Sequence, residues 1–167
     1  MLDELAEQRG FFKSRVSYGA WLHATTAFHR EVARALQAGG FGDMVDDDRV
    51  VLLLEDLGDL GLVPGPAPIG GRLEIGSSAD LLGVTYVVEG AALGSRVLYK
   101  RAQALGLSAA FGARFLAAEA ADLEAWRETV ARLDEADLAE TDRMRAIRAG
   151  RMAFEFAREC LDGRRCT

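Results

Sequence analysis

The chain has 167 residues, 50% of them hydrophobic and 28% charged, and this length and apolar content predict a single domain, residues 1–167, with a core of its own. Twenty basic against 26 acidic residues give a net charge of −6, which argues against nucleic acid as a partner because phosphate backbones are bound by concentrated basic faces. No apolar run approaches the roughly 18 residues that span a bilayer, so no membrane anchor is expected.

Histidine and cysteine are scarce. The histidines are His23 and His29, and the cysteines are Cys160 and Cys166. Two cysteines at this spacing near a polar end form neither a disulfide framework nor the paired ligands of a structural zinc site. The N-terminus also lacks the basic and apolar segments of an export signal. We therefore expect the chain to be cytoplasmic.

The composition predicts an all-α fold, because helix-forming residues dominate and all three prolines fall within 64–68. A first short helix is predicted over 2–8, ending near Gly10. A second spans about 14–36, where apolar residues recur at three- and four-residue steps, and ends at the glycine pair 39–40. A third follows the aspartates 46–48, which suit a helix N-terminus as caps, and stops near Gly61.

The second half of the chain begins with a connector over 64–78 that contains the three prolines and several glycines. A long apolar helix is then predicted from Ser78, its N-cap, to about residue 105. A turn and a further helix follow from residue 108. An amphipathic helix is expected around 122–133, and a final helix from about 140 to 161.

Gly90 and Gly94 lie inside the long apolar helix and, being four residues apart, share one face. Each costs roughly 0.5–1 kcal/mol relative to alanine in a helix interior, so a compensating role is expected. One interpretation is close packing of a neighbouring helix. The other is a flat ligand lying against exposed backbone, with a kink that makes room for it. Periodicity does not separate the two.

The segment 83–98, GVTYVVEGAALGSRVL, resembles the distal-helix signature of bacterial heme oxygenases of the phytochrome-associated, biliverdin-producing kind. Three other stretches agree with this family: residues 56–61, residues 106–107 together with 112–115, and the pair Trp126-Arg127. Together they cover most of the chain from about Tyr18 onward. The distal string is the specific part of the resemblance, and the others support it.

The resemblance implies an all-α heme oxygenase fold with a glycine-kinked distal helix, in which heme is both cofactor and substrate and is opened to biliverdin, CO and iron. Backbone at Gly90 and Gly94 would be the catalytic element, since a Cβ there would clash. Tyr86, Ser95 and Arg127 would bind heme, with Tyr86 in a distal polar network and Arg127 paired with a propionate. Ser95 departs from a glycine pair that is usual in the family.

The family's iron ligand is one histidine in a pattern resembling Thr-x-x-x-His-x-x-Leu-Asp. Leu2-Asp3 resembles the tail of that pattern, which would place the ligand just upstream of Met1. Residues 25–29 also have the Thr-x-x-x-His spacing, which makes His29 the alternative metal candidate. Taking His29 as the ligand leaves too short a stretch before Gly90 for the intervening helices, so the first match is preferred.

Three explanations of the missing ligand stay open at this point: a start placed too late or a truncated chain, loss of the usual heme ligation, or ligation by another side chain. Two functions follow from them. One is a heme oxygenase that needs heme, an electron donor and a proximal ligand. The other is a non-catalytic helical module of the same fold, with a degenerate active site, that acts by protein–protein interaction in signalling, with a homodimer as one form.

Overall fold

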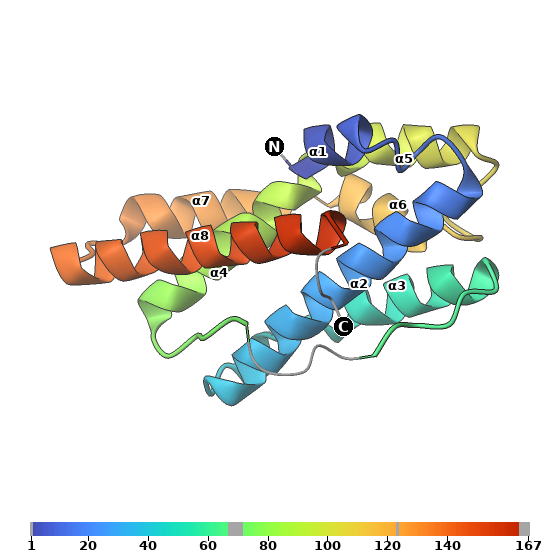
Figure 1. Cartoon of the computed structure of the whole chain (residues 1–167). Coiled ribbons are helices and arrows are strands. Elements are labelled where there is room, and N and C mark those ends of the chain that lie inside the picture. Colours follow the sequence, from blue (N-terminus) through green and yellow to red (C-terminus); the bar gives the residue numbers. More distant parts are fainter. Residues whose placement is uncertain (1, 67–71, 123, 164–167) are drawn as a thin grey trace.

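A computed structural model of the chain describes residues 2–66, 72–122 and 124–163 (Figure 1). These residues form eight α-helices, which confirms the all-α prediction. The helices are α1 (Leu2–Gln8), α2 (Arg15–Ala38), α3 (Asp47–Asp59), α4 (Ser78–Ala92), α5 (Ser95–Ala104), α6 (Arg114–Ala121), α7 (Glu124–Glu135) and α8 (Glu140–Leu161), with a short 3₁₀ turn, η1 (Gly42–Met44). Cys166 and residues 67–71 of the predicted connector lie outside the described residues.

The boundaries of α1 and α2 agree with the sequence prediction. Ser14 caps α2, because its hydroxyl accepts a hydrogen bond from the backbone N–H of Ser17 at 3.1 Å. At the other end, Gly39 caps the helix and Gly40 follows in the left-handed region, with φ of +82°. A residue with a side chain is disfavoured in that conformation, so the glycine determines where α2 stops.

The start of α3 differs from the prediction in one respect. Asp46 occupies the N-cap position, but its side chain makes no capping hydrogen bond, so the expected aspartate cap is wrong there. The Asp46 carboxylate instead lies 3.4 Å from the Arg49 guanidinium one turn later. The ion pair draws the carboxylate away from the free N–H groups of the first turn.

The predicted long apolar helix consists of two helices, α4 and α5, whose axes differ by 41°. Ser77 rather than Ser78 is the N-cap of α4, and it accepts a hydrogen bond from the Asp80 N–H at 3.2 Å. The break lies at Leu93 and Gly94, whose N–H groups bond three residues back at 3.4 and 3.3 Å. This tightened turn confirms the kink expected at the glycines.

The helices α4 and α8 lie side by side and cross in close contact (Figure 1). A Cβ added to Gly83 would lie 2.0 Å from the carbonyl oxygen of Ala146, and one added to Gly150 would lie 3.1 Å from the carbonyl oxygen of Gly83. The two glycines therefore let the backbones touch. Close packing of a neighbouring helix backbone, one of the interpretations of Gly90 and Gly94, is thus seen at Gly83.

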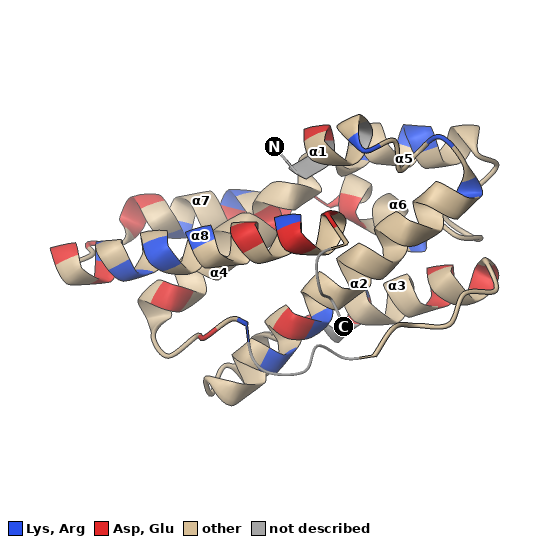
Figure 2. Ribbon diagram, viewed as in Figure 1, with Lys and Arg blue, Asp and Glu red and all other residues tan. Residues whose placement is uncertain are grey.

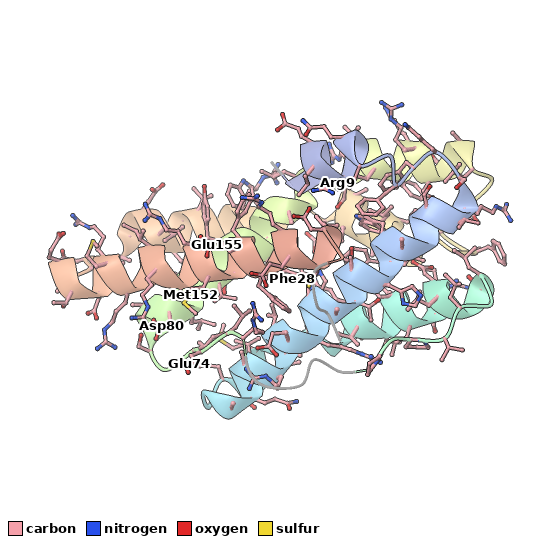
Figure 3. The ribbon with its side chains drawn as sticks, viewed as in Figure 1. Arg9, Phe28, Glu74, Asp80, Met152 and Glu155 are labelled. Atoms are coloured by element: carbon pink, nitrogen blue, oxygen red, sulfur yellow. The ribbon has the colours of Figure 1, made fainter. Side chains whose placement is uncertain are left out.

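Two groups of buried apolar side chains form the core. One lies where α2, α4 and α8 meet and includes Phe28, Val84 and Phe156. The other lies among α2, α3, α5 and α6 and includes Tyr18 and Leu116. Figure 3 shows Phe28 where α2 passes α8, and its ring centroid is 6.3 Å from that of Phe156. Full burial of one such side chain contributes roughly 1.5–3 kcal/mol, so these contacts hold α2 against α8.

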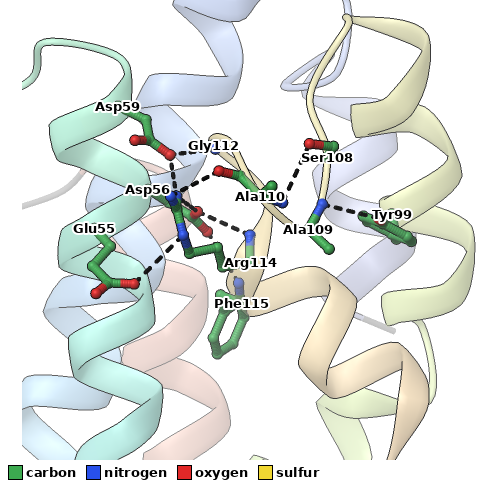
Figure 4. A network of polar contacts seen from close by, with 10 residues as sticks. All are labelled: Glu55, Asp56, Asp59, Tyr99, Ser108, Ala109, Ala110, Gly112, Arg114 and Phe115. Atoms are coloured by element: carbon green, nitrogen blue, oxygen red, sulfur yellow. Dashed lines mark hydrogen bonds and ion pairs between the residues drawn. The ribbon is translucent and has the colours of Figure 1, made fainter.

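A polar network attaches α6 to α3 (Figure 4). Asp56 is fully buried and accepts hydrogen bonds from the backbone N–H groups of Arg114 at 2.9 Å and Phe115 at 3.1 Å. Asp59 accepts from the Gly112 N–H at 2.7 Å and pairs with the Arg114 guanidinium. Burial raises the pKa of Asp56, and the bonds from Arg114 and Phe115 oppose that rise. Asp56 thus supplies, from another helix, the cap that Ala113 lacks.

Charged side chains of both signs are mixed along α8 rather than separated into a basic stretch (Figure 2). No single helix among the described residues is long and apolar enough to cross a membrane. The bent pair of α4 and α5 passes that test together, by length and composition alone. Half of the residues of α4 are buried against its neighbours, among them Ala79, Leu81, Val84 and Val88.

Replacing Gly83 by alanine tests the α4–α8 crossing. Its Cβ would overlap backbone that cannot rotate away, so we expect a loss of at least about 2 kcal/mol in the free energy of unfolding, measured by urea denaturation. Gly58→Ala in α3 is the matched control, because nothing lies within 4 Å of an added Cβ there. It should gain about 0.5–1 kcal/mol. Equal effects of the two substitutions would contradict the crossing.

Candidate functional site

The outer side of the broken helix carries an apolar stripe that the rest of the fold leaves uncovered. The exposed fractions are 49% for Tyr86, 40% for Leu93 and 51% for Val97, and Gly90 between them is partly exposed. The spacings of four, three and four residues place all four on one side of α4 and α5. We call Tyr86, Gly90, Leu93 and Val97 the break face.

One edge of the break face is made by α7. The Trp126 ring lies 5.3 Å from the Tyr86 ring between centroids, at an angle of 50°. A Cβ added to Gly90 would lie 3.4 Å from the same indole, so Trp126 packs close to the Gly90 backbone. Arg127 follows, with 72% of its side chain exposed and only a long ion pair of 3.5 Å to Glu124. The structure therefore brings Tyr86, Gly90 and Trp126 together, and Arg127 is the next residue of α7.

The other predicted residues of this helix lie inside the fold. Gly94 is buried at the break, where its carbonyl accepts the N–H groups of Val97 and Leu98 at 3.0 and 3.1 Å and begins α5. Ser95 is 4% exposed and nine residues from Tyr86, hence on the opposite side of the helix. Ser95 borders a cavity of about 70 Å³ together with Ala91 and Ala92. That volume is far below the several hundred Å³ of ordinary ligand pockets.

The buried side of α4 carries an ionic cluster that the sequence analysis missed. The Arg49 guanidinium donates two hydrogen bonds to Glu89, both 2.7 Å long, and one to Glu119, 2.9 Å long. The three groups come from α3, α4 and α6 and are largely buried. We call Arg49, Glu89 and Glu119 the Arg49 cluster. The sequence indicates this cluster only through a charged residue on the apolar face of each of the three helices. Helical spacing does not show which of these charged side chains form ion pairs with each other.

His29 lies beside this cluster and not on the break face. It is 9% exposed, and its ring packs edge-on against Phe28 and Phe115, each with centroids 5.3 Å away. Burial, with the positive charge of Arg49 as a second cause, lowers the pKa of His29 to about 3. The imidazole is therefore neutral, and no hydrogen bond joins it to any side chain or backbone group that the structure describes.

His23 is half-buried and lines a surface hollow with Val16, Leu62 and Phe111, at the end of α2 nearer its N-terminus. Neither histidine therefore reaches the break face. No group of three or more metal-binding side chains occurs among residues 2–66, 72–122 and 124–163. This arrangement does not support His29 as the metal ligand.

The state of His29 gives a pH-dependent stability. In the unfolded chain the pKa is near 6.5 and in the folded protein about 3, so acid protonates the unfolded state first. The contribution of neutral His29 is complete above pH 6.5 and falls by about 1.4 kcal/mol per pH unit as the pH decreases toward 3. We expect urea denaturation between pH 7 and 5 to show this slope, and His29→Gln to reduce it. Identical slopes in both proteins would show that His29 is not buried as neutral imidazole.

Comparison with known proteins shows which proteins this chain resembles. The sequence model of the heme oxygenase family, "Heme oxygenase", matches residues 72–162. The heme oxygenase PigA of Pseudomonas aeruginosa is 32% identical over 172 residues, a match that covers 96% of this chain and 84% of PigA. The solved NO- and CO-bound heme oxygenase of Neisseria meningitidis is 26% identical, with a TM-score of 0.75 over 97% of this chain and 83% of that one. The chain belongs to the heme oxygenase family.

Proposed function

We propose that the chain binds heme against the break face and carries out its oxidative opening to biliverdin, with release of CO and iron. The observation that supports this best is an uncovered apolar stripe at a glycine break, in the helix where the family resemblance is most specific. PigA and the Neisseria protein are both named heme oxygenases, and each matches nearly the whole of this chain. No comparison favours the alternative of a module without catalysis.

The break face suits one side of a porphyrin. Leu93 and Val97 offer apolar surface, and Gly90 has no side chain to hold a flat ring away from the helix. Arg127 lies next to Trp126 with its guanidinium free of a short ion pair, and it is the cation proposed for a propionate. Tyr86 borders the same surface. Ser95 faces the opposite side of the helix, so we assign it a place behind the site instead of direct contact.

Heme, when bound, supplies the redox chemistry that opens its own ring. The residues of this chain position it and shield it. Gly90 carries no side chain on this side of the helix, which would leave space for a small reactant, whereas Gly94 acts from inside the fold by forming the break. Tyr86 and Trp126, whose rings contact each other at the edge, cover part of that space from water. Ring opening consumes electrons, so an electron-donor protein is a proposed partner, and the cytoplasm is the proposed location.

An axial nitrogen is the part of the site that the described histidines do not provide, because His23 and His29 both lie away from the break face. We propose that this nitrogen comes from a histidine just upstream of Met1, where the family resemblance places it. Free imidazole should take its place in solution. A homodimer, proposed from the sequence, is a separate arrangement and is not needed for the site.

A hemin titration with and without imidazole tests the proposal. We expect this chain to bind hemin at a ratio of one to one, with a Soret band that shifts when millimolar imidazole is added. The shift arises because the added nitrogen completes the iron coordination. With imidazole, a reductase and oxygen, we then expect biliverdin to form. A Soret band that does not shift when imidazole is added, and that is absent in the His29→Gln variant, would contradict the assignment of the site.

Val97→Glu places a carboxylate on the break face and should weaken hemin binding by about tenfold or more, since an apolar contact is replaced by a charge. Val16→Glu is the matched control, because Val16 is an exposed valine on α2, away from the break face. It should bind hemin as the unchanged chain does. Equal weakening by both substitutions, or no binding of hemin under either condition, would refute the proposed surface.

A further inference from the structure

A second cavity lies on the side of α4 that faces away from the break face. Its volume is about 460 Å³, within the range of small-molecule sites, and it is formed between α2, α3, α4, α6 and α7. Its apolar wall comes from α2 and α4 and includes Val32, Leu36, Val84 and Val88. The Arg49 cluster lies at the other side of the same cavity. Apolar and ionic surfaces therefore meet around one space.

The charges that face this cavity do not balance. The single guanidinium of Arg49 serves both Glu89 and Glu119, and Asp46 also lies 3.4 Å from it. The remaining charged groups of the lining come from α3, from the end of α6 and from α7. They are Asp48, Asp122, Glu128 and Arg132. Six carboxylates thus face two guanidinium groups, and the excess is negative.

Glu119 shows the effect of this imbalance. Burial raises its pKa, Arg49 lowers it, and the neighbouring Glu89 and Asp46 raise it again. A carboxylate that shares its only guanidinium with a second carboxylate is incompletely neutralised. A cation in the cavity would supply the missing positive charge.

His29 provides an independent sign of a ligand. It lines this cavity, is nine-tenths buried, and has no hydrogen-bond partner among the described residues. Its neutral ring has one nitrogen with a lone pair, which can accept a hydrogen bond, and one N–H. Buried polar groups in native proteins nearly always have a partner. An N–H donor in the cavity would satisfy the acceptor nitrogen of the ring.

We propose that this cavity binds a small organic cation with an apolar body, such as a protonated amine or an amidinium. The carboxylates of Glu119 and Glu89 lie next to its positive charge, and His29 accepts a hydrogen bond from one of its N–H groups. Val32 and Val88 contact its apolar part. The excess of carboxylates excludes an anion. A bare metal ion has no set of three ligands among the described residues. The proposal does not depend on heme binding, since the cavity lies on the other side of α4.

Benzamidine is a suitable probe, because it joins a planar cation to an apolar ring. We expect titration calorimetry on the full chain to show one site per chain. NMR of the His29 ring should show a shift of its carbon-bound protons on binding. Benzamide has the same shape without the charge and should not bind measurably. A response to benzamide equal to that for benzamidine, or no binding of benzamidine up to millimolar concentration, would overturn the proposal.

Glu119→Gln should weaken benzamidine binding by about tenfold or more, because it removes one of the two buried carboxylates. Glu140→Gln is the control, since it makes the same change at an exposed position on α8 outside the cavity. Ala125→Leu keeps every charge and fills part of the cavity, so it separates loss of binding from loss of folding, which circular dichroism monitors. The proposal requires Ala125→Leu to abolish binding in a folded protein. Equal binding by Glu119→Gln and Glu140→Gln would overturn it.

Discussion

The hydrogen bonds from Arg49 to Glu89 and Glu119 are the interaction on which the geometry of the site depends. They join α3, α4 and α6 at Glu89, the residue that precedes Gly90, and the three side chains are largely buried. Removing one partner of such a buried group leaves an uncompensated charge and costs on the order of 3–5 kcal/mol. Together with the backbone contact of Gly83 and Gly150, these bonds fix α4 at both ends of its length, and the break at Leu93 follows directly after the fixed part.

This anchoring gives α4 two unlike sides. One side is exposed and largely apolar, and it carries Tyr86, Gly90 and Leu93. The other is buried and ionic, and it adjoins the neutral His29. A flat apolar ring fits the first side, and a small cation fits the second. Because Glu89 and Gly90 are adjacent in the chain, the hydrogen bonds of Glu89 to Arg49 also fix the position of Gly90 on the break face.

Much of the fold could be predicted from local signals. The Ser14 cap and the left-handed glycines at 40 and 61 mark helix ends that any chain of this sequence would favour, and the predicted helices agree closely with those observed. Two features depend on which charged groups pair with each other and could not be predicted. Asp46 leaves its capping position for Arg49, and Arg49 in turn meets carboxylates from two later helices. The nine-residue spacing of Tyr86 and Ser95 indicates on its own that they lie on opposite sides of the helix, whereas the size of the 41° bend between α4 and α5 could not be predicted.

The central claim is that the outer side of the broken helix is the heme-binding surface. Hydrogen–deuterium exchange with and without hemin, in the presence of imidazole, measures this directly because it reports each segment separately. If heme binds there, we expect slower exchange in peptides that cover residues 86–98 and 126–127. Slower exchange confined to residues 15–23 and 59–62, around the hollow that contains His23, would contradict it, as would no change anywhere in the chain.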